Sequence, residues 1–305
     1  MTQVARAALY TLLSSSIGCG DDSSDATGLG DAGEDASSTE TQDPTSSGEG
    51  STTTGVETTT MDDPSEETSS DDGEDTGGGI SSALLTIDDQ HSPPRLLRVD
   101  VDTGAATEIC TLALGSAYDS IAFTRDGTLF AHNVARGRIE TINPCNCGFQ
   151  IVGLTGTGSL ELAGDPMGGL VALDLALDAF SVVNPSTGLS TIVGPLGVSV
   201  STAGIAWPDD AELPLMLDAT TNALYSIDTG SGLGTQIAAL SQNLTQAGMD
   251  VLEPEGSLFV CAAGILYRVD PTDGAVQTIG ALGLVNACHN LAAPPAALAC
   301  LESRA

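Results

Sequence analysis

The chain contains no lysine, and all eight of its positively charged residues are arginines. Chemistry that depends on a lysine amine is therefore excluded, including Schiff-base catalysis, the phosphate-binding Walker loop and the Ser-x-x-Lys motif. The 41 acidic residues leave a formal net charge of −33 at pH 7. Because so negative a surface repels phosphate groups, we expect no binding to nucleic acid and no electrostatic docking on anionic membranes.

Aromatic side chains are also scarce, at 3% of the residues, with a single tryptophan, Trp207. Quinone and carbohydrate sites commonly hold their ligands against aromatic side chains, so this scarcity argues against both. We therefore predict no cofactor and interpret Trp207 as a core residue. The histidines His91, His132 and His289 include no pair at metal-ligand spacing, and we predict no metal site.

The N-terminus has a positive charge at Arg6, a short apolar run over residues 7–13 and small residues before Cys19. The run is too short to cross a bilayer as a helix, and the pattern is typical of a secretory signal. The ending Ile17-Gly18-Cys19 resembles the lipobox of bacterial lipoproteins, although Ser16 stands where that family usually has leucine. The resemblance implies a signal peptide over residues 1–18 and lipidation of Cys19. Plain secretion without a lipid is the alternative.

Residues 19–80 consist mainly of Ser, Thr, Asp, Glu and Gly, with no aromatic side chain and no positive charge. Such a segment cannot offset its ordering entropy by burying apolar surface, so we predict a disordered tether. A flexible coil of about 60 residues spans on the order of 40 to 45 Å, and repulsion between like charges extends it further. The tether would hold a folded domain of residues 81–305 clear of a membrane surface.

From residue 83 onward, short alternating apolar runs are separated by turns rich in Gly, Pro, Asp and Asn. One pattern recurs, in which a strand ends at an Asp or Asn and a turn follows. Successive copies of this turn residue lie 41 to 44 positions apart, which is a regular repeat. The turn residues are Asp100, Asn143, Asn184, Asp228 and Asp270.

Each repeat holds four short strands, for example residues 121–123 and 128–131 joined by Arg125-Asp126-Gly127. Four strands in about 42 residues, with hairpin turns between them, form the unit of a β-propeller blade. We predict an all-β domain, a propeller of five blades with four antiparallel strands each. Six blades follow instead if residues 297–302 form a further strand, and an open sandwich or a solenoid is another alternative.

The ends of the domain predict how the ring closes. The first repeat begins at residue 83 without an inner strand, whereas residues 290–294 look like an inner strand without the rest of a blade. We expect both ends to share one blade, because this pairs strands that would otherwise be exposed edges.

The phrase Leu-Tyr-x-Val-Asp-Pro-x-x-Gly at residues 266–274 is followed by Ile279-Gly280. It resembles the repeats of bacterial YVTN-type and quinoprotein-like propellers, over residues 83–305. These families include enzymes, scaffolds and surface proteins, so the resemblance implies a fold and leaves the reaction open. Signal, acidic tether and propeller together look like cell-envelope lipoproteins of Gram-negative bacteria. This implies export to the outer membrane or cell surface, with a periplasmic or secreted location as the alternative.

The predicted propeller contains six cysteines, and an even set in an exported chain indicates disulfide bonds. Six cysteines permit fifteen pairings, and the sequence does not choose among them. Cys145 and Cys147 are separated by one residue and would close a strained ring, so we expect each to pair elsewhere or one to stay free. The candidates are Cys110, Cys145, Cys147, Cys261, Cys288 and Cys300.

The sequence predicts no catalytic site. It has no Gly-x-Ser-x-Gly motif, and the carboxylate pairs Asp88-Asp89 and Asp209-Asp210 fall at predicted turns, where solvated carboxylates are common. Residues 100–104 resemble part of a calcium loop but lack the remaining oxygen ligands. His132-Asn133 and Cys288-His289-Asn290 could meet near the ring axis, and we interpret them as structural polar groups.

We therefore predict a non-catalytic, envelope-anchored propeller that acts as a binding or scaffolding module. Its partner would be an envelope or extracellular protein or a small ligand, and it would reach the membrane through the lipid anchor only. The alternative is a secreted hydrolase or lyase in which carboxylates converge with His132 or His289 at the axial mouth. Two carboxylates within about 4 to 6 Å of such a histidine in one pocket would favour the enzyme.

Overall fold

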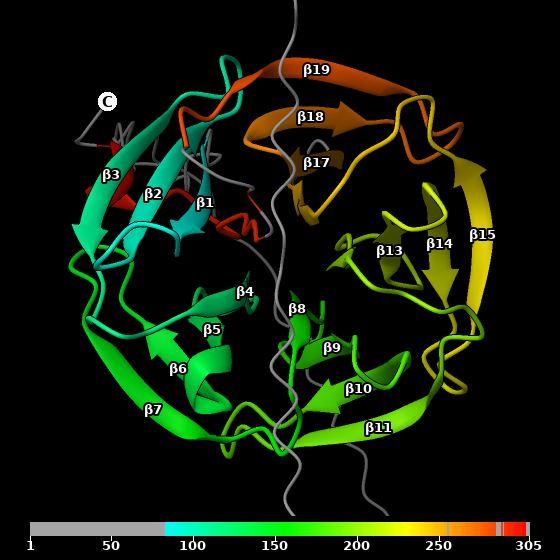
Figure 1. Cartoon of the computed structure of the whole chain (residues 1–305), viewed down its shortest axis with the longest axis horizontal. Helices are drawn as coiled ribbons and strands as arrows, with labels where there is room; N and C mark the ends of the chain where they lie inside the picture. Colours follow the sequence, from blue (N-terminus) through cyan, green and yellow to red (C-terminus); the bar gives the residue numbers. More distant parts are fainter. Residues whose placement is uncertain (1–82, 255, 285–287, 289, 303–305) are drawn as a thin grey trace, which may run out of the picture. The chain divides into compact units, whose positions relative to one another are not determined.

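The computed structural model describes residues 83–302 apart from 255, 285–287 and 289 (Figure 1). These residues belong to the second of two compact units, which begins at Asp71. The predicted signal segment, the lipidation site Cys19 and the tether lie outside the described residues, as does His289. In the part of the chain that is described, no helix has the length and apolar character needed to cross a membrane.

Five antiparallel sheets surround a common axis, and each is one blade of a β-propeller (Figure 1). The predicted fold class is confirmed. Blade 1 contains β1 (Ala83–Asp88), β2 (Arg95–Asp100) and β3 (Ala106–Thr111). Blade 2 contains β4 (Tyr118–Phe123), β5 (Leu129–Asn133), the 3-10 helix η1 (Val134–Arg136), β6 (Arg138–Ile142) and β7 (Phe149–Leu154). Blade 3 contains β8 (Leu160–Gly164), β9 (Leu170–Asp174), β10 (Ala179–Val183) and β11 (Ser190–Pro195). Blade 4 contains β12 (Ala203–Ala206), β13 (Leu215–Asp218), β14 (Ala223–Ile227) and β15 (Gly234–Ala239). Blade 5 contains β16 (Ala247–Leu252), β17 (Ser257–Ala262), β18 (Ile265–Val269) and β19 (Val276–Ala281).

The two ends of the domain share blade 1, as predicted from its incomplete first and last repeats. The closing segment, residues 290–292, lies along β1 at the inner position. The Leu85 N–H donates to Ala292 O at 2.8 Å, and the Ala292 N–H donates to Leu85 O at 2.9 Å. The buried Asn290 side chain accepts a further bond from the Ile87 N–H at 2.7 Å. The inner edge of β1 is therefore paired, and the ring is closed.

Of the two blade numbers considered, five is right. Ala299–Glu302, which would have begun a sixth blade as a strand, forms the short helix α1. Leu301 of this helix is buried in a core cluster with residues of blades 1 and 2, such as Leu96 and Ile142. The helix therefore packs against blades 1 and 2 and does not form a further blade.

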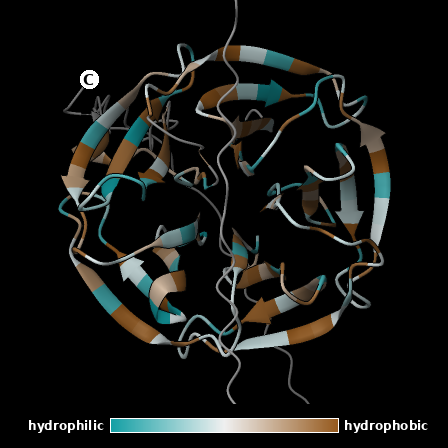
Figure 2. Ribbon diagram, viewed as in Figure 1, coloured by the Kyte–Doolittle hydropathy of each residue, from teal (hydrophilic) through white to brown (hydrophobic). Residues whose placement is uncertain are grey.

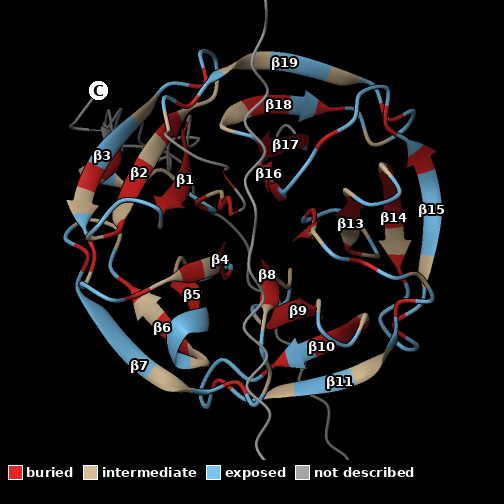
Figure 3. Ribbon diagram, in the orientation of Figure 1, coloured by how far each residue is buried: buried red, intermediate tan, exposed pale blue. Residues whose placement is uncertain are grey.

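Burial falls from the axis to the rim (Figure 3). The inner strands β4, β8, β12 and β16 are buried along almost their whole length, while most residues of the outer strands β7, β11 and β19 are exposed or half-buried. An inner strand lies between two neighbouring blades, so both of its faces need apolar side chains. Figure 2 shows hydrophobic residues on the strands of every blade.

The repeated Asp or Asn ends the third strand of each blade with the same turn. In blade 4, Asp228 Oδ1 accepts bonds from the Gly230 N–H at 3.1 Å and from the Ser231 N–H and hydroxyl at 2.7 Å each. Gly232 then has a φ of +80°, a conformation that favours glycine, and its N–H donates to Asp228 O. The side chain satisfies the turn locally, which explains why the pattern recurs once per blade.

Neighbouring blades touch through a repeated pair of small residues. The turn glycine of one blade lies against a bulge residue in the outer strand of the blade before it. A Cβ on Gly232 would lie 2.5 Å from Gly194 O, and one on Gly104 would lie 2.7 Å from Gly280 O, so a side chain does not fit. The pairs are Gly153 with Gly188, Gly194 with Gly232, and Gly280 with Gly104. At the junction of blades 4 and 5, Gly274 lies against the Ala239 backbone and the Ala238 side chain.

At the remaining junction, between blades 1 and 2, cysteines occupy the same two positions. Cys110 lies across from Leu96 at the bulge of β3, and Cys147 has the turn conformation with φ +59°. A disulfide joins them, with a Cα–Cα distance of 5.8 Å. The repeat therefore replaces a close backbone contact by a covalent bond at this one junction.

Disulfides also hold the C-terminal segment. Cys145 in the turn of blade 2 bonds to Cys300 of α1, and Cys261 of β17 bonds to Cys288 just before the closing segment. Cys145 and Cys147 thus pair with different partners, as expected from their spacing. Among the described residues, disulfides therefore involve blades 2 and 5, the two neighbours of blade 1, in which the ring closes.

Candidate functional site

The ends of the inner strands meet around the axis and enclose a small hollow, which we call the axial mouth. It offers about 50 Å³ to water-sized groups. A space of this size admits a few such groups, for example the end of one side chain, and excludes larger ligands. Its lining comes from every blade: residues 123–125, residues 164–166, Trp207, Asp209, Asp250, Val251, Glu253 and residues 293–295.

The axial mouth is acidic. Asp165, Asp209, Asp250 and Glu253 line it, against a single lining cation, Arg125. Arg125 donates to the Pro166 carbonyl at 3.1 Å, and the Asp209 N–H donates to Glu253 Oε1 at 3.1 Å. The four carboxylates come from blades 3, 4 and 5, so they gather only when these three blades pack around the axis.

Asp250 lies in the inner strand β16 and connects blade 5 to Ala293, the residue after the closing segment. It accepts bonds from the Ala293 N–H at 2.7 Å and from its neighbour, the Val251 N–H, at 2.8 Å. Burial raises the pKa of Asp250 to about 7; the two N–H groups lower it, and the charge of Glu253 raises it further. Near neutral pH this carboxyl can therefore gain or lose a proton.

A larger hollow, the blade 3 groove, adjoins the axial mouth. Its volume is about 470 Å³, and Asp165 and Trp207 line both hollows. Away from the axis its walls are mainly apolar and include Met167, Val182 and Pro185. Met167 is 88% exposed and Val182 46% exposed, so apolar groups face solvent here.

Trp207 forms the wall between the two hollows. It follows directly after the end of β12 and is half-buried, and its Nε1–H donates to the Ala211 carbonyl at 3.1 Å. The bond fixes the ring against its own loop. Sequence analysis interpreted this residue as core; the structure packs part of it against blade 4 and leaves part of it lining the surface.

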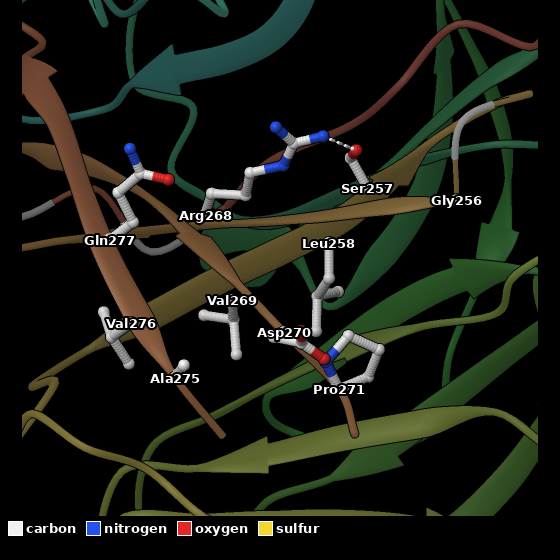
Figure 4. A pocket seen from close by; sticks show the side chains of 10 residues that line it. All are labelled: Gly256, Ser257, Leu258, Arg268, Val269, Asp270, Pro271, Ala275, Val276 and Gln277. Atoms are coloured by element: carbon white, nitrogen blue, oxygen red, sulfur yellow. Dashed lines mark hydrogen bonds between the residues drawn. The ribbon is translucent and has the colours of Figure 1, made fainter. Parts of the chain in front are cut away.

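Blades 2 and 5 carry grooves at the equivalent place, near the start of the second strand and the turn after the third. The groove of blade 5, of about 500 Å³, is drawn in Figure 4. There Arg268 reaches across to the Ser257 hydroxyl, beside Gln277, and its guanidinium lies 6.0 Å from the centre of the Phe259 ring. None of the residues lining either groove lines the axial mouth, so the blade 3 groove alone among these three continues to the axis.

A second polar group lies in the interior, between blades 2 and 3. Asp119, at a bulge in β4, has its Oδ1 2.7 Å from His132 Nδ1, and its Oδ2 accepts bonds from the Ser159 hydroxyl at 2.8 Å and the Leu160 N–H at 3.3 Å. Glu161 of β8 is buried nearby. Its burial, followed by the charge of Asp119, raises the pKa of Glu161 well above its usual range, while a bond to Ser120 lowers it.

This cluster is largely buried, with Asp119 and Ser159 half-buried. His132 is fully buried, and its Nε2 has no hydrogen-bond partner among the described residues. None of Asp119, His132, Ser159 and Glu161 lines the axial mouth or the three grooves. The histidine and carboxylate are thus adjacent, but outside the open hollows.

A neighbouring network surrounds Glu140, which is also fully buried. Its carboxylate accepts bonds from the Tyr118 hydroxyl at 2.7 Å, from Asn133 Nδ2 at 3.2 Å and from Arg138 Nε at 2.6 Å. Burial raises the pKa of the Tyr118 hydroxyl. A buried carboxylate with three donors is a structural ion pair, which agrees with the structural interpretation of Asn133.

The carboxylates that sequence analysis placed at turns have separate roles, and for Asp88 that placement was wrong, because it is the last residue of strand β1. Asp88 is buried and lies 2.6 Å from Arg95 Nη2, whereas Asp209 lines the axial mouth. Asp100 Oδ1 accepts bonds from the Thr103 N–H at 2.9 Å and the Thr103 hydroxyl at 2.7 Å, and these bonds, the hydroxyl's first, lower the pKa of Asp100. Across the described residues, no group of three or more His, Cys, Asp or Glu side chains is arranged to hold a metal ion.

Sequence analysis missed Asp119 and Asp250, because it weighed only carboxylates that come in pairs at turns. Both are single acidic residues inside otherwise apolar inner strands, as in Met249-Asp250-Val251. An unpaired carboxylate in a buried strand needs a partner or a raised pKa, and this signal could have found both.

No protein-family model and no curated protein matches the chain. Among solved structures, it is similar to a chain of a nidogen/laminin complex, with 14% identity, a TM-score of 0.48 and coverage of 66% of this chain and 78% of that one. It is also similar to a protein of unknown function from Bacteroides thetaiotaomicron, with 18% identity, a TM-score of 0.48 and coverage of 69% and 60%. Such distant likenesses concern the fold alone.

Proposed function

We propose that this chain is a non-catalytic binding or scaffolding propeller, exported and held at the cell envelope through a lipid on Cys19. The contrast between its open and closed polar groups carries the proposal. The axial mouth and the blade 3 groove have no histidine or cysteine in their lining. The histidine of the adjacent pair Asp119 and His132 is fully buried, and the Asp119 side chain is 14% exposed. The accessible hollows therefore offer apolar groups and carboxylates for holding a partner, without the histidine that the hydrolase or lyase alternative needs.

Export is supported by the disulfides. The six cysteines of the propeller are all joined in pairs, and such bonds persist in oxidising compartments outside the cytosol. The disulfides join blades 1 and 2 and hold the C-terminal segment on the ring, which favours presenting a fixed surface to a partner.

A second candidate, the secreted hydrolase or lyase, has one observation in its favour. Asp119 and His132 are in contact, and a second carboxylate, that of Glu161, lies close enough to Asp119 for their charges to interact. Catalysis there would require a substrate within hydrogen-bond reach of the base. None of these three residues lines the axial mouth or the three grooves.

The anchor is tested by the intact mass of the mature protein from membrane and soluble fractions of the producing cell. We expect a membrane-bound form that begins at Cys19 and carries acyl mass, and a Cys19→Ser variant that appears in the soluble fraction. A soluble wild-type chain without acyl mass would contradict the anchor.

Binding is tested separately, by placing a photo-reactive amino acid in turn at exposed positions of both faces and the rim. We expect cross-links to one protein from a contiguous set of positions, and the same cross-links in a His132→Gln background. If the wild type turned over a substrate and the His132→Gln variant did not, the enzyme would be supported instead.

A further inference from the structure

Positive charge is missing from a continuous half of the propeller. Between Arg138 and Arg268 the sequence has no arginine or lysine but thirteen acidic residues. This stretch includes all of blades 3 and 4 and the inner strands of blade 5. Apart from Arg125 of blade 2, the surface beside the blade 3 groove therefore has an excess of negative charge, and a cationic partner gains affinity and association rate from it.

The blade 3 groove adds an apolar contact to this charge. Met167 and Val182 present exposed apolar groups, and Trp207 presents part of its ring, within one hollow of about 470 Å³. Methionine and tryptophan are side chains that adapt to and anchor protein partners. A bare metal ion or a small polar cation would leave these groups unused.

The groove also has a direction. It runs from Val182 and Thr191 on blade 3, past Trp207 and Asp165, to the axial mouth. The mouth has space for the end of one side chain and holds four carboxylates. The apolar blade 3 groove, which ends in the acidic axial mouth, therefore fits a peptide segment with an apolar residue next to a basic one.

We propose that the blade 3 groove and the axial mouth together bind an extended segment of a partner protein, with an apolar side chain packed on Trp207 and Met167 and a lysine or arginine head in the mouth. This inference rests on the proposed binding function and names the class of its partner. A second copy of this chain is a poor occupant, because two molecules of charge −33 repel each other.

The groups that face Asp250 imply a pH dependence of this binding. Asp165, Asp209 and Glu253 face it with negative charge and Arg125 with positive charge, while residues 293–295 bring no charge. A basic head in the mouth stabilises the ionised form of Asp250, so binding displaces its proton. Affinity should then rise with pH up to the pKa of about 7 and level off above it.

The test uses the mature, disulfide-bonded chain and a fluorescein-labelled ten-residue peptide of alternating leucine and lysine, followed by anisotropy. Met167→Arg places a positive charge in the groove at a highly exposed position, and we expect it to weaken binding at least tenfold. Leu177→Arg is the matched control, with the same charge change on an exposed residue in the opposite hairpin of the same blade. It should change the dissociation constant less than twofold.

A second pair of variants tests the mouth. Asp209→Asn with Glu253→Gln removes two lining charges, and Asp210→Asn with Glu212→Gln removes two charges from the loop that follows Trp207 without touching the lining. We expect weakening of about tenfold from the first pair, and about the same affinity as wild type from the second. The wild type should bind less tightly at pH 6 than at pH 8.

Several results would overturn the proposal. Equal weakening by Leu177→Arg, or equal affinity for a peptide with serine in place of leucine, would show only ion exchange on an acidic surface. Concentration-dependent dimers blocked by Met167→Arg would make a second copy the occupant. In the producing cell, cross-links from Leu177 but not from Met167 would refute this groove while the binding function stands. Cross-links from no surface position would refute both.

Discussion

At the scale of single residues, buried carboxylates decide how this propeller responds to pH. Glu161 lies inside the blades next to the negative charge of Asp119, and burial is the larger cause of its raised pKa. Asp250 has a pKa of about 7 for the same main reason. Each stays protonated at a pH where the unfolded chain ionises, so each makes folding less favourable as the pH rises.

We predict that Glu161→Gln becomes increasingly more stable than the wild type as the pH rises from 5 to 8. The unfolded glutamate loses its proton near its ordinary pKa of 4.5, whereas the folded one holds its proton until a higher pH. Glutamine stays neutral in both states. The difference in the free energy of unfolding should grow by up to about 1.4 kcal/mol per pH unit until the folded pKa is reached. Urea unfolding at pH 5, 6.5 and 8 measures it.

Asp210→Asn is the control for this series, because Asp210 is exposed. Its unfolding curves should follow those of the wild type at every pH. A constant offset between Glu161→Gln and the wild type, with no dependence on pH, would mean that Glu161 ionises in the folded protein as easily as in the unfolded chain.

At the scale of elements, the contact between blades limits which side chains the outer strands can carry. We predict that Gly194→Ala destabilises the fold by about 3 kcal/mol, because the new Cβ would lie 2.1 Å from the Ser231 carbonyl oxygen. Gly158→Ala meets nothing within 4 Å and should change stability by less than about 0.5 kcal/mol. Urea unfolding of both variants checks this; equal stability would show that blades 3 and 4 can move apart freely.

Substitution can convert the junction between blades 1 and 2, where Cys110 and Cys147 form a disulfide, into the contact of small residues found at the other junctions. Cys110→Ala with Cys147→Gly reproduces the alanine and glycine at positions 238 and 274. We predict that this variant is about 1 kcal/mol more stable than Cys110→Ala with Cys147→Ala, because position 147 has a φ of +59°.

The two variants have lost the same disulfide, which closes a loop across a sequence separation of 37 and contributes about 4 kcal/mol in the chain-entropy description. That shared loss cancels in the comparison. Thermal unfolding of both should give a higher midpoint for the glycine form, and the reverse order would mean that the turn changes conformation once the bond is gone.

At the scale of the whole molecule, closure of the ring depends on the closing segment, residues 290–292, which follows all five blades in the sequence. We predict that Cys145→Ala with Cys300→Ala accelerates hydrogen exchange of the Leu85 and Ala292 amides, which bond across the closure. The bond spans 155 residues of sequence, so its loss releases more chain entropy than that of either other disulfide.

Exchange in β9 of blade 3, far from the closure in sequence and in the ring, serves as the internal control (Figure 1). It should stay slow under native conditions. Similar acceleration in β9 and at Leu85 would indicate global destabilisation rather than local opening of the ring.

The sequence indicated the fold well because its signals are local. Asp100, Asn143, Asn184, Asp228 and Asp270 each satisfy their own turn, so their spacing reads out the blade length directly. The shared blade also followed from local patterns, since residues 290–294 lacked the strands that should come after them. The partition of the cysteines into separate partners for Cys145 and Cys147 followed from spacing alone.

The candidate site was less accessible to sequence reasoning. Asp165, Asp209, Asp250 and Glu253 are up to 88 positions apart, and nothing in the chain says that their strands end at one axis. Trp207 was expected in the core because its neighbours are apolar. Its position one residue beyond β12 lets its ring line the groove instead.

What the sequence by itself determined is whatever depends on neighbours along the chain: the turns, the strand lengths, the acidic surface, and the number of repeats. What only the tertiary structure decided is which distant residues meet. It selected one of fifteen cysteine pairings, joined residues 290–292 to β1, enclosed Asp119 and His132 between blades, and opened the acidic mouth. Local conformation follows from nearby groups, but contacts around a ring depend on how all the blades fit together at once.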